Sequence, residues 1–316
     1  MRLAHLHLPN ITPFTRVSDL QQTLTTRLLT HKKLCSPGSI PSQEHGRPPA
    51  SPPPPPDPTI ITFSPNPVYT TGRRDLPPSN TSPSSSAATN TARNTKLSLP
   101  PSLEPIRSLL TPPTSNNKIN GNSHEHDPPR AEYHPTLRGG QTTYHGPGQM
   151  VAYTILDLKR LGLTPRCHIR VLENSVIDLL AGYGVEGFVT EDPGVWVHDP
   201  ASAGDQAQEP EQAKKITAVG VHLRRNISSF GVGLNVTNEP MWFFRQIVAC
   251  GLEGREVTSL AGLGVDGVGV DEVASAFVRC FVDRVNRDFA CTPRGGGSGE
   301  KIEEVYQITE EDLLGS

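Results

Sequence analysis

A glycine-rich stretch from residue 138 to residue 149 gathers the densest set of chemically useful side chains in the sequence. Its residues, RGGQTTYHGPGQ, combine four glycines with Arg138, Tyr144 and His145. A backbone without Cβ atoms turns sharply and approaches a ligand closely, while the three side chains supply a positive charge and several hydrogen-bond donors. Apolar alternation follows over residues 151–155. The pattern predicts a substrate-binding loop that leads into a strand.

Cys250 is a candidate nucleophile, because Gly251 and Gly254 follow it and favour an exposed turn. A thiol with an ordinary pKa of about 8.5 is largely protonated at neutral pH, so a nucleophilic role needs a neighbouring cation. Lys215 is the candidate cation, since it begins a strand of apolar and small residues. On spacing alone, two ordinary alternatives stay open: Cys250 as a small buried residue and Lys215 as a solvated lysine beside Lys214.

Two residues of the glycine-rich loop have open roles. His145 could act as a general base or donate a hydrogen bond to a substrate, or it could pack in the core. Arg138 could bind a carbonyl group or a phosphate-bearing carrier, or it could form a surface salt bridge. Cys280 lies on the apolar face of a predicted helix, so we expect it to pack in the core.

The elements that would position these residues follow from hydrophobic periodicity. Alternating or β-branched residues predict strands at 5–8, 59–63, 150–156 and 194–197, and a hairpin over 215–236 around Asn226. Helical spacing predicts helices at 20–28, 169–182, 240–248 and 273–281. Because the two patterns alternate irregularly, we predict an α+β fold with a mixed β-sheet.

Composition separates these elements from two poorer segments. The 316 residues include 32 prolines, and only 34% of the chain is hydrophobic. Residues 35–58 are rich in proline and serine, and residues 75–130 consist mainly of Ser, Thr, Asn and Pro. Residues 75–130 have too few aliphatic side chains to offset the conformational entropy lost on ordering. We therefore expect this segment to be disordered. We expect the histidines in or beside it, His124, His126 and His134, to be solvated and to bind no metal.

Bulk properties exclude several classes of protein. A formal net charge of −3 gives no support for a nucleic-acid binder, and without an apolar run of about 18 residues no transmembrane helix is expected. The five cysteines are scattered without CxxC spacing, which indicates neither a disulfide framework nor a zinc site. The first 34 residues are basic, with Asp19 as their single acid. That bias suits a mitochondrial targeting segment, although the segment also has the pattern of a strand and a helix.

Taken with Tyr153 and Asp157, the loop at 138–149 resembles the signature of the octanoyl (lipoyl) transferase family, in its fungal-like, mitochondrial form. Further blocks agree in the same order along the chain: Pro67–Arg73 (PVYTTGR), Gly194–Val197 (GVWV), Lys215–Gly220 (KITAVG), Asn235, and Cys250–Gly251 with VTSL at 257–260. Such agreement in register is specific to the family. Ala249 departs from it, because the family has proline before the cysteine.

The resemblance implies the fold of the biotin and lipoate protein ligase catalytic domain, a mixed sheet flanked by helices. It implies a catalytic dyad of Cys250 and Lys215. The implied acyl pocket comprises Arg138, Gly139, Gly140, Gln141, Thr142, Thr143, Tyr144, His145, Ala218, Val219, Gly220, Gly231, Val232 and Gly233. The implied organisation is a catalytic domain at 1–34, 59–74 and 131–289, insertions at 35–58 and 75–130, and a tail at 290–316.

In function, the resemblance implies an acyltransferase of lipoate biosynthesis. Members of the family move octanoate from octanoyl-acyl carrier protein to lipoyl domains of 2-oxoacid dehydrogenase E2 subunits and to the glycine cleavage H protein, through a cysteine thioester. Because the donor thioester is already activated, no cofactor or metal is expected. Three alternatives stay open: an ATP-dependent lipoate or biotin ligase, a non-catalytic module that binds acyl carrier protein, and a cysteine hydrolase.

Overall fold

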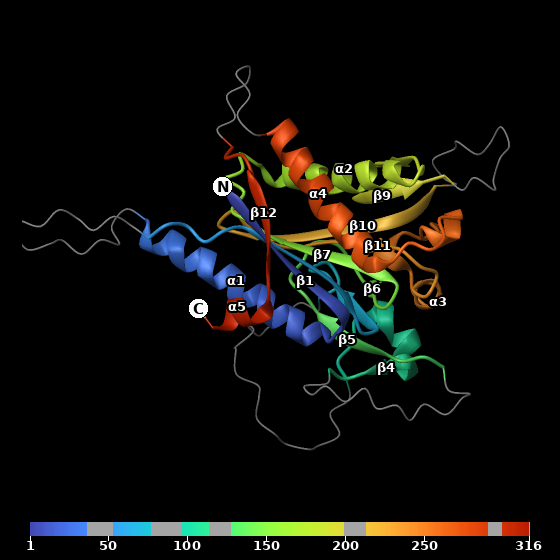
Figure 1. The fold of residues 1–316 in the computed structure, drawn as a ribbon. Coiled ribbons are helices and arrows are strands. Elements are labelled where there is room, and N and C mark those ends of the chain that lie inside the picture. The colour runs from blue at the N-terminus through green and yellow to red at the C-terminus, as the bar shows by residue number, and fades with distance from the viewer. Residues whose placement is uncertain (37–52, 77–96, 114–127, 199–212, 290–298, 316) are drawn as a thin grey trace, which may run out of the picture.

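Two β-sheets form the frame of this computed structural model, which describes residues 1–36, 53–76, 97–113, 128–198, 213–289 and 299–315 (Figure 1). The larger sheet has the strand order β12-β1-β2-β7-β11-β10-β9-β8. Its strands are β1 (Arg2–Thr12), β2 (Thr59–Pro65), β7 (Gln149–Ile155), β8 (Gly187–Phe188), β9 (Gly194–Val197), β10 (Lys214–Arg224), β11 (Ile227–Asn235) and β12 (Glu304–Ile308). The smaller sheet, in the order β4-β5-β3-β6, contains β3 (Val68–Thr71), β4 (Leu110–Thr111), β5 (Ala131–Pro135) and β6 (Thr143–His145).

The larger sheet is mixed. Strands β12, β1 and β2 run parallel to one another, whereas the pairings from β2 through β7, β11, β10 and β9 to β8 are antiparallel. The β10–β11 hairpin turns at Arg225 and Asn226, whose φ angles of 52° and 63° are those of a tight turn that matches the twist of the strands. The predicted hairpin around Asn226 is therefore confirmed.

Helices cover both faces of the larger sheet (Figure 1). Helices α2 (Pro165–Gly182) and α4 (Val270–Asp288) pack on one face, and α1 (Phe14–Leu34) packs on the other. Each helix buries a stripe of residues spaced three or four apart, as an amphipathic helix does; in α1 the stripe is Phe14, Val17, Leu20, Leu24 and Leu28. This arrangement confirms the α+β fold with a mixed sheet flanked by helices. Among the described residues, no helix is long and apolar enough to cross a bilayer.

The prediction that 75–130 is disordered is wrong for part of that segment. Residues 101–109 form the 3₁₀ helix η1, and β4 follows and pairs with β5. Leu103 and Ile106 are buried in a cluster with Tyr144 and Phe243. Two or three buried aliphatic side chains are enough to hold a short helix. The average composition of the whole segment does not show them. Residues 77–96 and 114–127 lie outside the described residues, and for them disorder remains a prediction.

Two other sequence expectations need correction. Residues 290–316 are not only a tail, because β12 pairs with β1 and the short helix α5 (Glu310–Leu314) follows it. The helix predicted at 240–248 is reduced to α3 (Met241–Phe244), and Val248 is extended, with φ −83° and ψ 91°. The partner of β12 lies near the other end of the sequence, so local pattern could not reveal that pairing.

The N-terminal segment is an integral part of the fold. Strand β1 lies between β2 and β12, with Leu3 and Leu6 buried, and α1 closes one face of the sheet. The basic character of 1–34 is concentrated at the end of α1, where His31, Lys32 and Lys33 complement the negative end of the helix dipole. Of the proline- and serine-rich insertion at 35–58, residues 37–52 lie outside the described residues.

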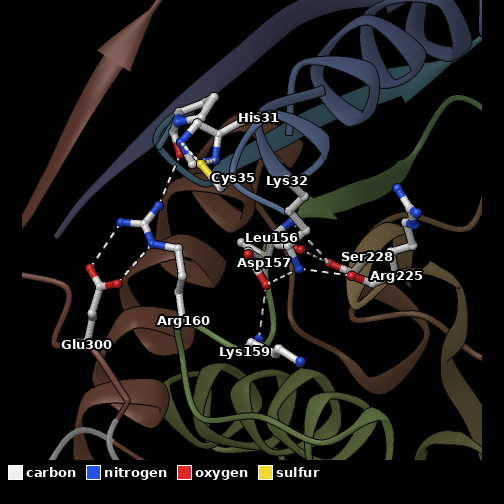
Figure 2. Close-up of polar contacts among 11 residues, drawn as sticks. His31, Lys32, Cys35, Leu156, Asp157, Lys159, Arg160, Arg225, Ser228 and Glu300 are labelled. Atoms are coloured by element: carbon white, nitrogen blue, oxygen red, sulfur yellow. Dashed lines mark hydrogen bonds and ion pairs between the residues drawn. The ribbon is translucent and has the colours of Figure 1, made fainter. Parts of the chain in front are cut away.

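A polar corner joins α1, the end of β7 and the β10–β11 hairpin (Figure 2). Asp157 accepts a hydrogen bond from Lys32 Nζ at 2.7 Å, and the same ammonium donates to the carbonyl of Arg225 at 2.9 Å. Beneath it, the fully buried Ser228 hydroxyl donates to the carbonyl of Thr154 at 2.6 Å and accepts from the Leu156 N–H at 3.1 Å. This corner fixes the hairpin, and with it one wall of the site described below.

We expect Ser228→Ala to lower the free energy of unfolding by about 1–3 kcal/mol, because the Leu156 N–H loses its hydroxyl acceptor in a buried position. Urea unfolding measures the change. The matched control is Ser229→Ala, whose hydroxyl makes one long bond of 3.4 Å to the carbonyl of His222. Equal losses in the two variants would contradict the prediction.

Candidate active site

A cavity of about 240 Å³ lies between the glycine-rich loop, the hairpin β10–β11 and the turn that carries Cys250. Both Lys215 and Cys250 line it. The other predicted residues that line it are Arg138, Gly139, Gly140, Gln141, Thr143, His145, Ala218, Val219, Gly220, Gly231, Val232 and Gly233. The structure thus brings together residues that are separated by more than a hundred positions in the sequence.

Thr142 and Tyr144 were predicted to line the cavity, but they lie behind its wall. The Tyr144 ring stacks on Phe243 with ring centroids 4.3 Å apart and belongs to the core of the smaller sheet. Thr142 is buried, and its polar groups bind Asp75 and Ser102. Alternation explains both errors, because successive residues of an extended segment face opposite sides.

Glycines keep the cavity open along the hairpin. A Cβ at Gly231 would lie 2.2 Å from the carbonyl oxygen of Ala152 on the neighbouring strand. A Cβ at Gly233 would lie 3.0 Å from Cε1 of His145. Side chains at these positions would push the strand or the histidine out of place, so the two glycines keep this wall of the cavity in its geometry.

Cys250 lies at a strained turn. It is half-buried in the 3₁₀ turn η4 (Ala249–Gly251), with φ 58° and ψ 16°. A left-handed conformation costs an ordinary L-residue about 1–2 kcal/mol, so neighbouring contacts must hold it. The backbone N–H of Cys250 donates to the carbonyl of Thr142 at 2.8 Å. Gly251 follows with φ 70° and packs against the side chain of Gln141.

Lys215 is a buried lysine, with 7% of its surface exposed. Its ammonium donates to the carbonyl of Pro193 at 3.1 Å and lies 4.6 Å from the centre of the Trp196 ring. Burial lowers the pKa of Lys215, and the nearby groups Cys250 and Asp192 act in the opposite direction. A lysine with a lowered pKa gives up its proton more readily than a solvated one, and a larger fraction of it is in the neutral form that can accept a proton at neutral pH. The alternative of a solvated Lys215 is therefore wrong.

Backbone pairing explains why the cysteine segment returns to β10. The N–H of Lys215 donates to the carbonyl of Glu256 at 2.9 Å, and the N–H of Thr258 donates to the carbonyl of Lys215 at 3.0 Å. This parallel bridge, between Lys215 and Val257, attaches the stretch after Cys250 to the strand that carries the lysine. The bridge thus brings the segment that follows Cys250 to the start of β10, where Lys215 lies.

Arg138 is buried and forms no salt bridge to a described carboxylate. Its Nη2 donates to the carbonyl and the hydroxyl of Thr70, both at 2.9 Å, and its Nη1 donates to the carbonyl of Gly139 at 3.0 Å. Burial lowers its pKa, although Cys250, Tyr153 and Asp75 act in the opposite direction. The arginine therefore places a positive charge in the cavity wall while it ties the loop to the smaller sheet.

His145 lines the cavity as a neutral ring. Gln149 Nε2 donates to Asn235 Oδ1 at 2.6 Å, which leaves Gln149 Oε1 facing His145 Nδ1 at 3.2 Å. This oxygen therefore accepts a hydrogen bond from the N–H of His145 Nδ1. Burial, with the neighbouring Arg138, lowers the pKa of His145 to about 3. A group that is so weakly basic serves poorly as a general base. Its Nε2 is left as a hydrogen-bond acceptor, which favours a substrate-positioning role.

Several residues of the site carried no clear signal in the sequence. Arg74, Asp192, Pro193, Phe230 and Leu252 also line the cavity. Phe230 has a φ of 61°, which an aromatic residue seldom adopts, so only the structure could reveal its position. Sequence reasoning also misplaced His134: it is buried in β5 and pairs with Glu132 Oε2 at 2.8 Å, while His124 and His126 lie outside the described residues.

Comparison with known proteins identifies a family for the chain. Residues 123–282 match the lipoyl protein ligase A/B catalytic domain. The probable octanoyltransferase of Schizosaccharomyces pombe is 44% identical over 138 residues, which cover 43% of this chain and 57% of that protein. The octanoyltransferase of Paracoccus versutus is 41% identical over 153 residues, 47% of this chain and 94% of that protein. A crystal structure of P. falciparum LipL1 with lipoate has a TM-score of 0.52 at 9% identity. The match covers 100% of this chain and 68% of the LipL1 chain, so the two share the fold.

The mixed sheet flanked by helices and the family match over residues 123–282 define the class, a lipoyl protein ligase A/B catalytic domain. The chain belongs to the lipoyl protein ligase A/B catalytic domain family and, within it, to the octanoyltransferases, which are acyltransferases. Its matches span about three fifths of the relatives from S. pombe and Solibacter usitatus, 57% and 60% of their lengths.

We expect Gly251→Ala to slow the alkylation of Cys250 by iodoacetamide roughly tenfold, because small displacements at a reactive centre have large effects on rate. The added Cβ would lie 1.8 Å from Gln141 Oε1, so the turn or the glutamine must move. Mass spectrometry of the Cys250 peptide measures the rate.

Gly254→Ala is the matched control, since Gly254 has a similar φ of 73° but no described atom within 4 Å of the place that the added methyl group would take. That variant shares the backbone strain and lacks the collision. If both substitutions slow alkylation to the same extent, the contact with Gln141 does not position the cysteine.

Proposed function

We propose that the protein transfers an octanoyl group from octanoyl-acyl carrier protein to a lysine of a lipoyl domain, through a thioester on Cys250. The observation that carries this proposal is the placement of the buried Lys215 and the half-buried Cys250 on one glycine-lined cavity. The names of the curated octanoyltransferases support the choice of acyl group. The acceptors proposed are the lipoyl domains of 2-oxoacid dehydrogenase E2 subunits and the glycine cleavage H protein.

In the first half-reaction, the thiolate of Cys250 attacks the carbonyl carbon of the donor thioester. The bond from that carbon to the carrier's sulfur breaks, and the leaving thiolate takes a proton from the ammonium of Lys215. The lowered pKa of Lys215 suits it to this role, because a general acid–base group works best when its pKa lies near the working pH. The product is an octanoyl-Cys250 thioester.

In the second half-reaction, the amine of the acceptor lysine attacks the same carbonyl carbon. An amide bond forms, the Cys250 sulfur leaves, and neutral Lys215 takes the proton that the attacking nitrogen loses. Both members of the dyad then return to their starting state. Cys250's own N–H is bonded to the Thr142 carbonyl, so the oxyanion must be bound by other donors of the cavity.

The decisive experiment incubates the protein with octanoyl-acyl carrier protein and measures its intact mass. We expect one octanoyl adduct that maps to Cys250 and disappears when a lipoyl domain is added. Cys250→Ala removes the nucleophile and should abolish the adduct. Lys215→Ala should slow its formation by roughly 10²- to 10⁴-fold, the usual contribution of a general acid–base group.

Lys214→Ala is the matched control, because Lys214 is the neighbouring lysine and its ammonium pairs with Glu256 at 2.9 Å at the surface. It should react at close to the wild-type rate. An adduct that survives Cys250→Ala would overturn the proposal. Lipoylation that requires ATP and magnesium would indicate a ligase instead, and release of free octanoate without an acceptor would indicate a hydrolase.

We propose a mitochondrial location, for which the basic residues of α1 and the family's fungal-like form give support. Residues 1–34 also have a structural role, since β1 and α1 belong to the sheet and its cover. A fluorescent protein fused after residue 316 of the full chain should therefore coincide with a mitochondrial marker in fungal cells. A diffuse signal would overturn this proposal.

A further inference from the structure

We propose that Asp75 and Ser102 are positioning residues that hold the Cys250 turn through Thr142. The inference rests on the proposed function of Cys250, and it assigns a role to the segment at 75–130 that the family resemblance marks as an insertion. Residues 75 and 102 lie on either side of a stretch that the structure does not describe. Their side chains nevertheless converge on the same threonine.

The starting point is the backbone of Cys250. Its φ of 58° is unfavourable for an L-residue, and its N–H makes a hydrogen bond of 2.8 Å to the carbonyl of Thr142. The orientation of that carbonyl therefore influences how firmly the cysteine is held in its strained conformation. A peptide plane that could rotate would release the turn.

Every polar group of Thr142 is engaged. Its backbone N–H and its hydroxyl both donate to Asp75 Oδ2, each at 2.6 Å. Because the hydroxyl proton points to Asp75, Thr142 Oγ1 accepts the proton of Ser102, whose oxygen lies 2.8 Å away. The carbonyl accepts from Cys250. Such a fully satisfied network, centred on the buried Thr142, favours a single geometry.

Asp75 is itself held against the substrate loop. The N–H of Arg73 donates to the carbonyl of Arg138 at 3.0 Å, and the N–H of Asp75 donates to the carbonyl of Gly72 at 3.1 Å. Gly72 packs so tightly on the loop that a Cβ there would lie 2.2 Å from the carbonyl oxygen of Gly140. The carboxylate is thus presented to Thr142 by a rigid turn.

Ser102 reaches Thr142 from η1. The apolar anchors of this helix, Leu103 and Ile106, are buried beside Tyr144 and Phe243. The serine itself is at the surface, so Ser102→Ala removes one hydroxyl and leaves the anchors in place. This separates an effect on Cys250 from an effect on folding.

The test is a double-mutant cycle on Ser102→Ala and Thr142→Val. In the wild-type background, Ser102→Ala should lower kcat for octanoyl transfer and the rate of Cys250 alkylation by roughly three- to tenfold, the equivalent of one hydrogen bond. KM for the donor should stay unchanged, because Ser102 does not line the cavity. In the Thr142→Val background, which lacks the hydroxyl, Ser102→Ala should have almost no further effect.

Three comparisons complete the experiment. Ser102→Thr keeps the hydroxyl and should restore both rates, whereas Asp75→Ala removes the acceptor of two bonds and should lower them more than Ser102→Ala does. Ser108→Ala is the matched control on the same helix, since the Ser108 side chain is exposed and makes no hydrogen bond to another described residue. It should match wild type.

Two outcomes would overturn the proposal. One is an equal effect of Ser102→Ala in both backgrounds, and the other is an equal effect of Ser108→Ala, which would point to general stability. Unfolding midpoints of all variants show whether the rates merely follow stability. Alkylation of Cys250 needs no acyl donor, so the cycle gives an answer even if the wild-type protein transfers no octanoate and the proposed function fails.

Discussion

The site depends on two backbone hydrogen bonds that join Lys215 to the stretch after Cys250. They link the N–H and the carbonyl of Lys215 to Glu256 and Thr258. They attach the segment that follows Cys250 to the start of β10, while the N–H of Cys250 ties the turn itself to Thr142 of the glycine-rich loop. Since the lysine side chain begins from the same residue, this short parallel bridge helps to set the position of Lys215 relative to the turn that carries Cys250. The rest of the fold, from the buried hairpin to its covering helices, keeps this bridge in place.

Much of this arrangement could be predicted from the sequence, for identifiable physical reasons. Strand β2 and the β10–β11 hairpin follow from β-branched runs and a turn at Asn226, and the stripes of α1 and α4 follow from helical spacing. The glycine-rich loop indicated a ligand, and the family resemblance connected it to Lys215 and Cys250. The structure places both residues on one cavity and adds the burial and the charges that spacing could not supply.

The errors have two causes, contact between distant segments and the alternation of side chains along an extended segment. Residues 101–111 were assigned to disorder because their few aliphatic residues were averaged with a polar surrounding, yet Leu103 and Ile106 find partners in the smaller sheet. Thr142 and Tyr144 were assigned to the cavity because they belong to the signature, yet strand alternation turns them away from it. In both cases the local pattern was real, and the tertiary partner decided the outcome.

The pairing of β1 with β12 joins residues 2–6 to residues 304–308, and it has a consequence for synthesis on the ribosome. At a synthesis rate of about 5–20 residues per second, on the order of 15–60 s pass between the synthesis of β1 and the synthesis of β12, which pairs with its outer edge. During that time a strand with an open edge can pair with another chain. This edge of β1 therefore stays without its partner strand until residues 304–308 have been synthesised.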